Sequence, residues 1–405
     1  MKNLLISLLF FGLSLSESYA TAPSEPNITE TPGIVDKYVI PGFFGFKTIK
    51  NDPNNIYELK KYGPTYNIQT ISFTLNGKTE SVGQYLNKTG MQSIIVLQDD
   101  NILYEKYTLF NSPKTLYPAY SISKSLTSMA IGSLIYENII ISEEEPMGKY
   151  ASFLNDTAYS GVTFQQALRQ SSAVETLGAL EDAHIIAHLN MPWNGWENYL
   201  KTKKRMPNHA PGDVFNYAEL DPIALAVSLR AASGYSLAEY LQEKLWKRVG
   251  MSDNARYQLD HQGHEAGGNG LEATLRDYAR LGLLYAHQGE LNGQRVFTQE
   301  WLEKTITPTR YPKGALNFNK IKTVGYGYLC WPSLDDQNDF LMLGLFGKFI
   351  YVDLDSKIVI AKMAHYLANS GDKPTADYNG VAYADSVLAV SRTIRNAIIS
   401  GKHDM

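Results

Sequence analysis

The sequence contains a single cysteine, Cys330, among its 405 residues. A lone thiol cannot form a disulfide within the chain, which excludes a fold held together by internal cross-links. Cys330 lies between Leu329 and Trp331. We interpret it as a packed thiol rather than a nucleophile.

An excess of charge of either sign is also absent. Lys and Arg number 37, Asp and Glu number 41, the formal net charge is −4, and no long run of like charge occurs. This distribution does not indicate a nucleic-acid-binding surface. With 44% hydrophobic residues at this length, the chain is predicted to be globular, with one large core or two modest ones.

Two signatures of common enzyme sites are missing or incomplete. No G-x-S-x-G motif occurs, so an α/β-hydrolase would have no nucleophile. His261 and His264 form an H-x-x-H pair, flanked by Asp260 and Glu265, in Gly-rich sequence without the H-E-x-x-H spacing of zinc proteases. With no third ligand evident, we interpret this stretch as a solvated loop and predict no metal site.

The apolar run from Leu4 to Leu15 is about a dozen residues long, short of the roughly 20 that span a bilayer. Lys2 precedes it and Ser18-Tyr19-Ala20 follows it, a pattern typical of a secretory signal peptide over residues 1–20, cleaved after Ala20. A membrane anchor is the less favoured alternative. The mature chain is therefore expected in the periplasm or outside the cell, without stable membrane insertion.

Strand patterns stand at both ends of the mature chain, and helical patterns lie between them. Residues 21–84 are expected to be an irregular N-terminal extension, and residues 93–98 and 102–107 a β-hairpin. Residues 142–285 are predicted to be mostly helical. The sequence predicts an α/β (α+β) fold with one sheet assembled from both ends of the chain. The later elements are expected as strands over 325–331, 340–343, 349–353 and 358–363 and a helix over 383–399.

The stretch AYSISKSLTSMAIGSLIYENII, residues 119–140, opens a helix with serines and a lysine. Ser121 and Lys124 lie one turn apart on the same helix face. A partly desolvated lysine loses affinity for its proton, so a neutral amine could accept the hydroxyl proton of Ser121, while the helix N-terminus favours an oxyanion. The alternative is that Ser121 only caps the helix; Ser123 and Ser125 are interpreted as helix-start residues.

Tyr217 follows the turn Pro211-Gly212 and precedes an apolar helix. Penicillin-recognising serine hydrolases need a second proton carrier near the nucleophile, commonly a tyrosine on such a loop. A phenol titrates near 10, and nearby cations can lower its pKa. As an isolated residue, Tyr217 is one of 27 tyrosines and could equally be structural.

Four motifs occur in the order found in one enzyme family. They are Ser121-Ile122-Ser123-Lys124; Pro211-Gly212 leading to Phe215-Asn216-Tyr217; Gly270-Leu271-Glu272-Ala273-Thr274 with Asp277, Ala279-Arg280 and Gly282; and Gly325-Tyr326-Gly327-Tyr328 followed by Gly344 to Asp353. On these motifs, the chain resembles the class C β-lactamase-like serine hydrolases over about residues 92–399. This family includes β-lactamases, DD-peptidases, family VIII esterases and 6-aminohexanoate-dimer hydrolases, and the last two motifs are most similar to the 6-aminohexanoate-dimer hydrolase and esterase branch.

The resemblance implies a β-lactamase/transpeptidase-like fold over residues 85–400, with a helical subdomain at about 145–285. It implies acyl transfer: Ser121 attacks a carbonyl, Lys124 and Tyr217 carry the proton, and the backbone N–H groups of Ser121 and Lys348 stabilise the oxyanion. No metal or organic cofactor is expected. The expected partner is a small-molecule ester or linear amide, and the sequence carries no signal for an oligomeric state.

Two departures from the family pattern bear on the substrate. In lactamases the tyrosine motif is Y-x-N, but here the third position is Glu219, an acid that would repel anionic acyl groups or pair with a cation. The K-T-G or H-x-G motif is replaced by Leu345-Phe346-Gly347; a literal Lys88-Thr89-Gly90 precedes Ser121, on the wrong side for the family's motif. The substrate-binding residues are expected to be Glu219, Leu345, Phe346, Gly347 and Trp331.

Two other functions stay open on the sequence. One is a β-lactamase or DD-peptidase acting on β-lactams or peptidoglycan peptides. The other is a non-catalytic cell-wall-binding or sensor protein of the same fold, which the altered third motif suggests.

Overall fold

The structure is a computed structural model that describes residues 45–61, 66–176, 195–260, 262–309, 323–365 and 383–401. The predicted signal peptide and residues 21–44 lie outside the described residues. So does His261.

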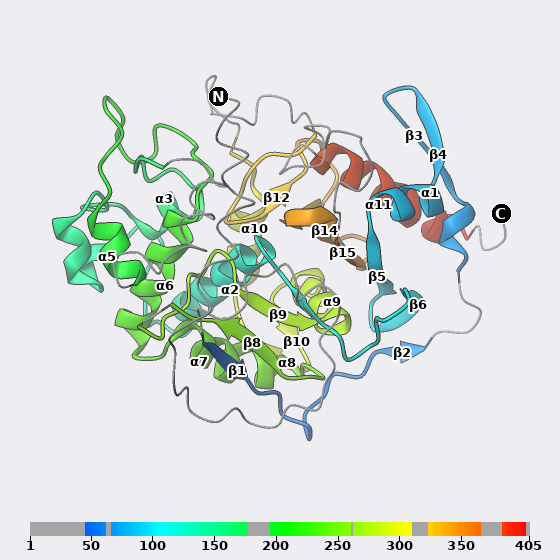
Figure 1. Ribbon diagram of the computed structural model, residues 1–405, viewed down its shortest axis with the longest axis horizontal. Helices are drawn as coiled ribbons and strands as arrows, with labels where there is room; N and C mark the ends of the chain where they lie inside the picture. Colours follow the sequence, from blue (N-terminus) through cyan, green and yellow to red (C-terminus); the bar gives the residue numbers. More distant parts are fainter. Residues whose placement is uncertain are drawn as a thin grey trace, which may run out of the picture.

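The main sheet has seven strands in the order β12-β13-β14-β15-β5-β6-β2. Strands β5 and β6 form the predicted hairpin, and β15 pairs antiparallel with β5, so that Ile360 lies opposite Val96. One sheet is therefore assembled from both ends of the chain, as the sequence predicts, and Figure 1 shows β5 beside β15. The strands are β2 (Lys60–Lys61), β5 (Met91–Gln98), β6 (Asn101–Tyr107), β12 (Trp331–Pro332), β13 (Asp339–Gly344), β14 (Lys348–Asp353) and β15 (Ile358–Ala364).

Every residue of β14 and β15 is buried, because helices cover both faces of the sheet. Helix α9 (Leu275–Ala286) packs on one face, and α11 (Ala384–Ile399) contacts β13 and β14 from the other (Figure 1). The close packing of α9 depends on Gly282, since a Cβ at this position would lie 2.5 Å from Val359 Cγ1. The β-branched runs of these strands thus form a sheet buried on both sides.

A four-stranded sheet with the order β1-β8-β9-β7 lies below the main sheet in Figure 1. Its strands β8 and β9 fall inside the region predicted to be mostly helical, because strands of four residues carry too little periodicity to stand out. Strand β1 belongs to the stretch expected to be irregular, yet it pairs with β8. The strands of this sheet are β1 (Phe46–Ile49), β7 (Leu116–Pro118), β8 (Ala255–Gln258) and β9 (Leu271–Thr274). Two separate pairs of strands are β3 (Ser72–Leu75) with β4 (Lys78–Ser81), and β10 (Glu290–Leu291) with β11 (Gln294–Arg295).

The helices between the two halves of the main sheet gather around α6 (Leu220–Ser233), which contacts α2, α3 and α5. Three helices of the region predicted to be mostly helical begin at a capping side chain: Thr163, Ser236 and Thr274 each accept a hydrogen bond from the backbone N–H three residues on. The remaining helices are α1 (Val82–Lys88), α2 (Ile122–Tyr136), α3 (Phe164–Leu168), α5 (Trp196–Lys201), α7 (Leu237–Leu241), α8 (Lys247–Val249) and α10 (Gln299–Ile306).

The predicted strand over residues 325–331 is wrong, since only Trp331 of that run belongs to a strand. Leu329 adopts a left-handed conformation with φ of 56°, which interrupts extended chain. Gly327 passes so close to the backbone that a Cβ there would lie 1.8 Å from the carbonyl oxygen of Thr305. Gly327 therefore permits a tight approach of this segment to α10 and does not continue a strand.

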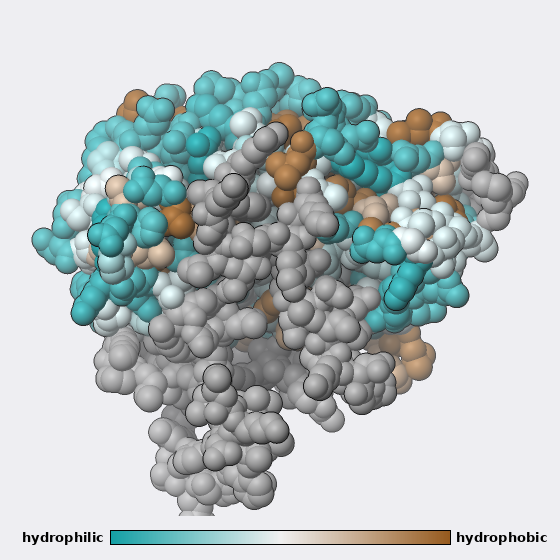
Figure 2. Space-filling model, turned by 90° about the horizontal axis from the view of Figure 1, so that it is seen from above, coloured by the Kyte–Doolittle hydropathy of each residue, from teal (hydrophilic) through white to brown (hydrophobic). Residues whose placement is uncertain are grey.

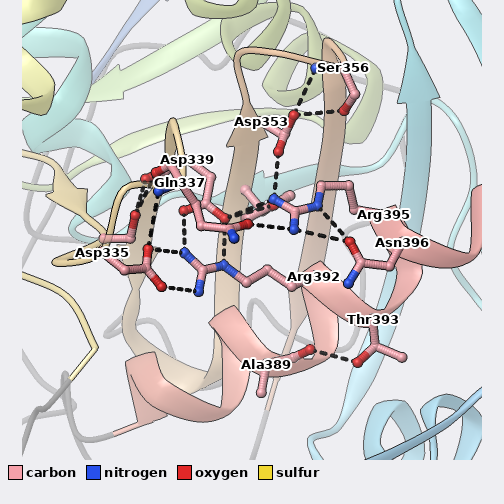
Figure 3. A network of polar contacts seen from close by, with 12 residues as sticks. Asp335, Gln337, Asp339, Asp353, Ser356, Ala389, Arg392, Thr393, Arg395 and Asn396 are labelled. Atoms are coloured by element: carbon pink, nitrogen blue, oxygen red, sulfur yellow. Dashed lines mark hydrogen bonds and ion pairs between the residues drawn. The ribbon is translucent and has the colours of Figure 1, made fainter. Parts of the chain in front are cut away.

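A network of ion pairs fastens α11 to the main sheet (Figure 3). Arg392 donates to Asp339 at 2.7 and 2.8 Å and to Asp335 at 2.7 Å, while Arg395 donates to Asp353 at 2.7 Å. Asp339 and Asp353 lie opposite each other on β13 and β14. The C-terminal helix is thus held by carboxylates from two neighbouring strands.

The described surface is mostly hydrophilic on the face shown in Figure 2, where hydrophobic residues form separate small groups. Scattered exposed apolar side chains are normal for a folded protein. Among the described residues, no helix has the length and apolar character required to cross a membrane.

Candidate active site

The segment before α2 brings Ser121 to the surface of the core. The backbone of Ala119 bonds to the Leu271 carbonyl of β9 at 2.7 Å, and Tyr120 adopts a left-handed conformation with φ of 49°. Such a conformation is uncommon outside glycine and is often found at functional sites. Every residue from Ile122 to Leu134 is buried, whereas Ser121 remains partly exposed.

The side chain of Ser121 does not cap α2. It occupies the N-cap position but makes no capping hydrogen bond. Instead its Oγ lies 3.1 Å from Nζ of Lys124, the residue one helical turn on. The two side chains therefore meet on one helix face, as their spacing predicts, and the capping explanation does not describe this serine.

Lys124 is 1% exposed, and its amine makes several hydrogen bonds. Besides Ser121, its Nζ donates to the Gly268 carbonyl at 3.2 Å and forms a buried ion pair with Glu219. Burial alone lowers the pKa of Lys124, but the carboxylate of Glu219, together with Tyr217, leaves that pKa raised above its ordinary value. The expectation that burial makes this amine neutral is therefore wrong for the resting site, because the sequence did not reveal the pairing with Glu219.

Glu219 lies behind the catalytic candidates rather than at an open surface. Its side chain is 5% exposed, and its second oxygen accepts a hydrogen bond from Asn269 at 3.3 Å. Gly268 leaves room for this carboxylate, since a Cβ there would lie 2.1 Å from Glu219 Oε2. Of the two roles that the sequence left open, the structure has the acid paired with a cation.

Tyr217 lies on the loop before α6, with its ring centroid 5.0 Å from Nζ of Lys124. Its ring also packs against Trp331 and Tyr326, at centroid distances of 5.7 and 6.0 Å. Burial raises the pKa of the Tyr217 phenol, and the charge of Lys124 opposes this effect without reversing it. The phenol is therefore protonated at neutral pH.

The turn between β13 and β14 lies beside the start of α2. Phe346 and Gly347 in this turn have φ angles of 62° and 83°, and a Cβ on Gly344 would lie 2.4 Å from the Ala119 carbonyl oxygen. The rings of Tyr120 and Phe346 meet edge to face at a centroid distance of 5.1 Å. The predicted oxyanion residue Lys348 thus begins β14 on a segment adjacent to Ser121.

Three side chains that the sequence analysis did not single out support these segments. Tyr383 donates to the backbone carbonyls of Gly344 and Lys348, the latter at 2.9 Å. Gln170 contacts the Tyr217 loop. Lys362 lies on β15, where its Nζ donates to Thr89 Oγ1 at 2.6 Å. Their partners are remote in sequence, so no local pattern could have identified them.

The buried amines of Lys348 and Lys362 differ from Lys124 because, in the part of the chain that the structure describes, no carboxylate pairs with either. Lys348 donates to the Ala364 carbonyl, and Lys362 donates to Thr89. Burial lowers the pKa of each amine to about 7, and the charge of Lys348 contributes to the shift at Lys362.

The expected substrate-binding residues divide into two groups. Leu345, Phe346 and Gly347 are partly exposed on the turn beside Ser121. Trp331 is 2% exposed and, like Glu219, lies behind the reacting groups, where it packs against Tyr217. Of these five residues, only the three on the turn are partly exposed.

Other sequence features have structural roles. Lys88 of the K-T-G sequence forms an ion pair with Glu80 at the end of α1. Burial raises the pKa of the Cys330 thiol to about 12, consistent with a packed thiol. Asp260 accepts backbone N–H groups of Trp196 and His264, and within the described ranges no cluster of three metal-ligating side chains occurs.

Comparisons with known proteins identify the family and the fold. The family model described as Beta-lactamase matches residues 86–385. The 6-aminohexanoate-dimer hydrolase of Paenarthrobacter ureafaciens is 23% identical over 322 residues, covering 77% of this chain and 80% of that protein. Among solved structures, a candidate 6-aminohexanoate-dimer hydrolase from Bacillus anthracis has a TM-score of 0.73 and 24% sequence identity, covering 87% of this chain and 92% of that chain. A family VIII carboxylesterase has a TM-score of 0.56 and 14% sequence identity, covering 77% of this chain and 94% of that chain.

Proposed function

The chain is a serine hydrolase of the Beta-lactamase family, and we propose that it cleaves a carboxylic ester or a linear amide through an acyl-enzyme on Ser121. The observation that carries this proposal is the contact of 3.1 Å between Ser121 Oγ and Lys124 Nζ, with the Tyr217 ring 5.0 Å from the same amine. A nucleophile within hydrogen-bond reach of a proton carrier, itself held by a third group, is the arrangement that covalent catalysis requires.

The buried ion pair supplies a route to a basic amine. Transfer of one proton from Lys124 to Glu219 turns an ammonium and a carboxylate into a neutral amine and a neutral acid, with no change of net charge in the site. The neutral amine then accepts the hydroxyl proton as Ser121 Oγ attacks the substrate carbonyl. Tyr217, which is protonated at rest, donates to the leaving alkoxide or amine and is reprotonated from Lys124.

The second half of the reaction uses the same groups in reverse. Water attacks the acyl-serine ester, its proton passes to the Tyr217 and Lys124 pair, and the serine leaves with its proton restored. We assign the oxyanion in both halves to the backbone N–H groups of Ser121 and Lys348, at the N-terminus of α2 and the start of β14.

The turn that contacts the substrate favours an uncharged acyl group. Leu345 and Phe346 occupy the places where family members carry the cationic or hydrogen-bonding residue that meets a substrate carboxylate. The relative from Paenarthrobacter ureafaciens is named for hydrolysis of a linear amide dimer, and one structural neighbour is a carboxylesterase. Both names support an ester or linear amide over a β-lactam carboxylate.

Serine replacement tests the proposal. Purified Ser121→Ala should lose hydrolysis of a short-chain p-nitrophenyl ester and labelling by an activated phosphonate. Ser123→Ala, on the same helix start, is the matched control and should keep both. Unchanged turnover in Ser121→Ala would refute the assignment, and an unlabelled wild-type Ser121 would favour a non-catalytic binding protein. Nitrocefin turnover exceeding that of esters and linear amides would favour a β-lactamase.

We also propose export with cleavage after Ala20, on the basis of the apolar run from Leu4 to Leu15. Expression of the full chain in a bacterium, followed by cell fractionation and mass measurement, tests this. A mature protein beginning at Thr21 in the periplasm or medium is expected. An uncleaved chain in the membrane fraction would show an anchor instead.

A further inference from the structure

The segment that follows α3 is shaped to contact the loop carrying Tyr217. Gln170 is fully buried, and both it and Ala173 adopt left-handed conformations, with φ of 54° and 55°. From this strained segment the carbonyls of Ser171 and Ala173 accept hydrogen bonds from Gly212 and Met206 at 2.7 and 2.8 Å. Residues 170–173 thus lie along the loop that leads to Tyr217.

Gln170 contacts the peptide groups on both sides of Tyr217. Its backbone carbonyl accepts a hydrogen bond from the N–H of Asn216 at 2.7 Å, and its side-chain Oε1 accepts one from the N–H of Ala218 at 2.5 Å. One residue therefore bonds to the neighbours immediately before and after the phenol. Tyr217 itself belongs to no helix or strand, so no regular backbone ladder holds this part of the loop.

We propose that Gln170 is a positioning residue, which holds the Tyr217 phenol over Lys124 and Ser121 by accepting these two hydrogen bonds. This inference rests on the proposed role of Tyr217 as the proton donor to the leaving group. Proton transfer requires heavy atoms within hydrogen-bond distance, and a displacement of about 1 Å can reduce a rate about 100-fold. The left-handed conformation of Gln170 aims its carbonyl and its side chain at the same loop.

The side-chain oxygen is the part of Gln170 that a substitution can remove cleanly. The Nε2 group of Gln170 is buried and finds no acceptor among the described residues. Gln170→Met keeps the length of the side chain and loses the acceptor for Ala218. Gln170→Glu keeps an acceptor at the same position and is the conservative variant expected to restore function.

The test compares two esters of the same acyl group, one with a p-nitrophenyl and one with an ethyl leaving group. Because kcat/KM reports acylation, only the poor leaving group depends strongly on proton donation by Tyr217. In Gln170→Met we expect kcat/KM to fall about 30-fold for the ethyl ester and less than about threefold for the p-nitrophenyl ester. In Gln170→Glu the ratio between the two esters should lie within about threefold of wild type.

Gln166→Met is the matched control. Gln166 also bonds to the loop, through Pro211 at 3.0 Å, and caps α3, but it makes no contact next to Tyr217. It should lower thermal stability and reduce kcat/KM for both esters by the same small factor.

Three results would overturn the inference. The first is an equal loss on both esters in Gln170→Met. The second is a selective loss of ethyl ester hydrolysis in the control Gln166→Met that matches the loss in Gln170→Met. The third, if Gln170→Met does not fold, is a Gln170→Glu variant that folds and yet loses ethyl ester hydrolysis selectively. A wild-type protein that hydrolyses neither ester and is not labelled at Ser121 by the activated phosphonate overturns the proposed function and with it this role for Gln170.

Discussion

Two groups of buried charges, one under α11 and one around Ser121, are stabilised in different ways. Under α11, Arg392 and Arg395 each bond to carboxylates of the sheet, and these contacts outweigh burial and raise the pKa of both guanidinium groups. Around Ser121, within the described part of the chain, Lys124 alone has a carboxylate partner, while Lys348 and Lys362 donate to carbonyl and hydroxyl oxygens. The two guanidinium groups therefore stay charged at every physiological pH.

The difference shows where the fold retains groups that can change charge. Burial holds the pKa values of Lys348 and Lys362 at about 7, so both amines titrate close to neutrality. In the α11 network, by contrast, Asp335 has a lowered pKa because it pairs with Arg392. The network under α11 therefore serves stability, and the electrostatics beside the turn of Gly344 to Lys348 depend on pH.

The largest effect is expected from removing one charge of the active-site pair. Glu219→Gln leaves the buried Lys124 without its carboxylate, and breaking a buried pair in this way costs about 3–5 kcal/mol of unfolding free energy. The proposed acceptor for the Lys124 proton is also lost, so that proton must leave to solvent, and kcat/KM should acquire a rise with pH that wild type lacks. Urea unfolding and pH–rate profiles measure both effects.

Glu197→Gln provides the control for this change. Glu197 pairs with Arg230, and both side chains are partly exposed. Its loss should cost less than about 1 kcal/mol and leave the pH profile in place. Equal destabilisation by the two variants would contradict the distinction between the buried pair and ordinary ion pairs.

The next largest effect is expected from Asp339→Asn, which tests whether the α11 network contributes to stability without affecting catalysis. Asp339→Asn removes the buried carboxylate that accepts from Arg392 and from the hydroxyl of Tyr351 at 2.9 Å. We expect a loss of about 2–3 kcal/mol in urea unfolding, with kcat/KM and its pH dependence unchanged. Asp335→Asn, on the exposed side of the network, should cost under about 1 kcal/mol. A changed pH profile in Asp339→Asn would show coupling to the site.

A pH-dependent effect is expected at Lys362. Its pKa is about 7 in the fold and near 10.5 in the unfolded chain, so between these values the unfolded state binds one more proton. The free energy of unfolding should therefore rise with pH over this range, by about 1.4 kcal/mol per pH unit for this lysine. Lys362→Met should remove that part of the slope and be more stable than wild type near pH 7. Identical slopes between pH 7 and 10 would contradict the depressed pKa.

The start of α2 could be predicted because its determinants are local. Helix periodicity alone places Lys124 one turn from Ser121, and β-branched runs with intervening turns indicate the strands β5, β6, β13, β14 and β15. The charge of Lys124 could not be predicted, since its partner Glu219 is 95 residues away. A desolvated lysine and a paired lysine look the same in sequence, and they have opposite pKa shifts.

The support of the site depends even more on distant contacts. Gln170 follows a short helix with no motif of its own, and its two bonds exist only because two loops pack together. The strand predicted over 325–331 failed for the same reason: Gly327 serves a close approach to Thr305, which no local pattern reveals. Residue types near the nucleophile were predictable, and the contacts that set their charge and position were not.

The smallest effect should come from the hydroxyl of Tyr383, which bonds to both ends of the turn that carries Lys348. Tyr383→Phe removes one donor and should lower the unfolding free energy by about 1 kcal/mol. If the backbone N–H of Lys348 stabilises the oxyanion, a looser turn weakens that contact for every leaving group. The kcat/KM values for ethyl and p-nitrophenyl esters should then fall by the same factor, about three- to tenfold. This uniform loss would separate oxyanion support by Tyr383 from proton-donor support by Gln170, and a loss confined to the ethyl ester would contradict that separation.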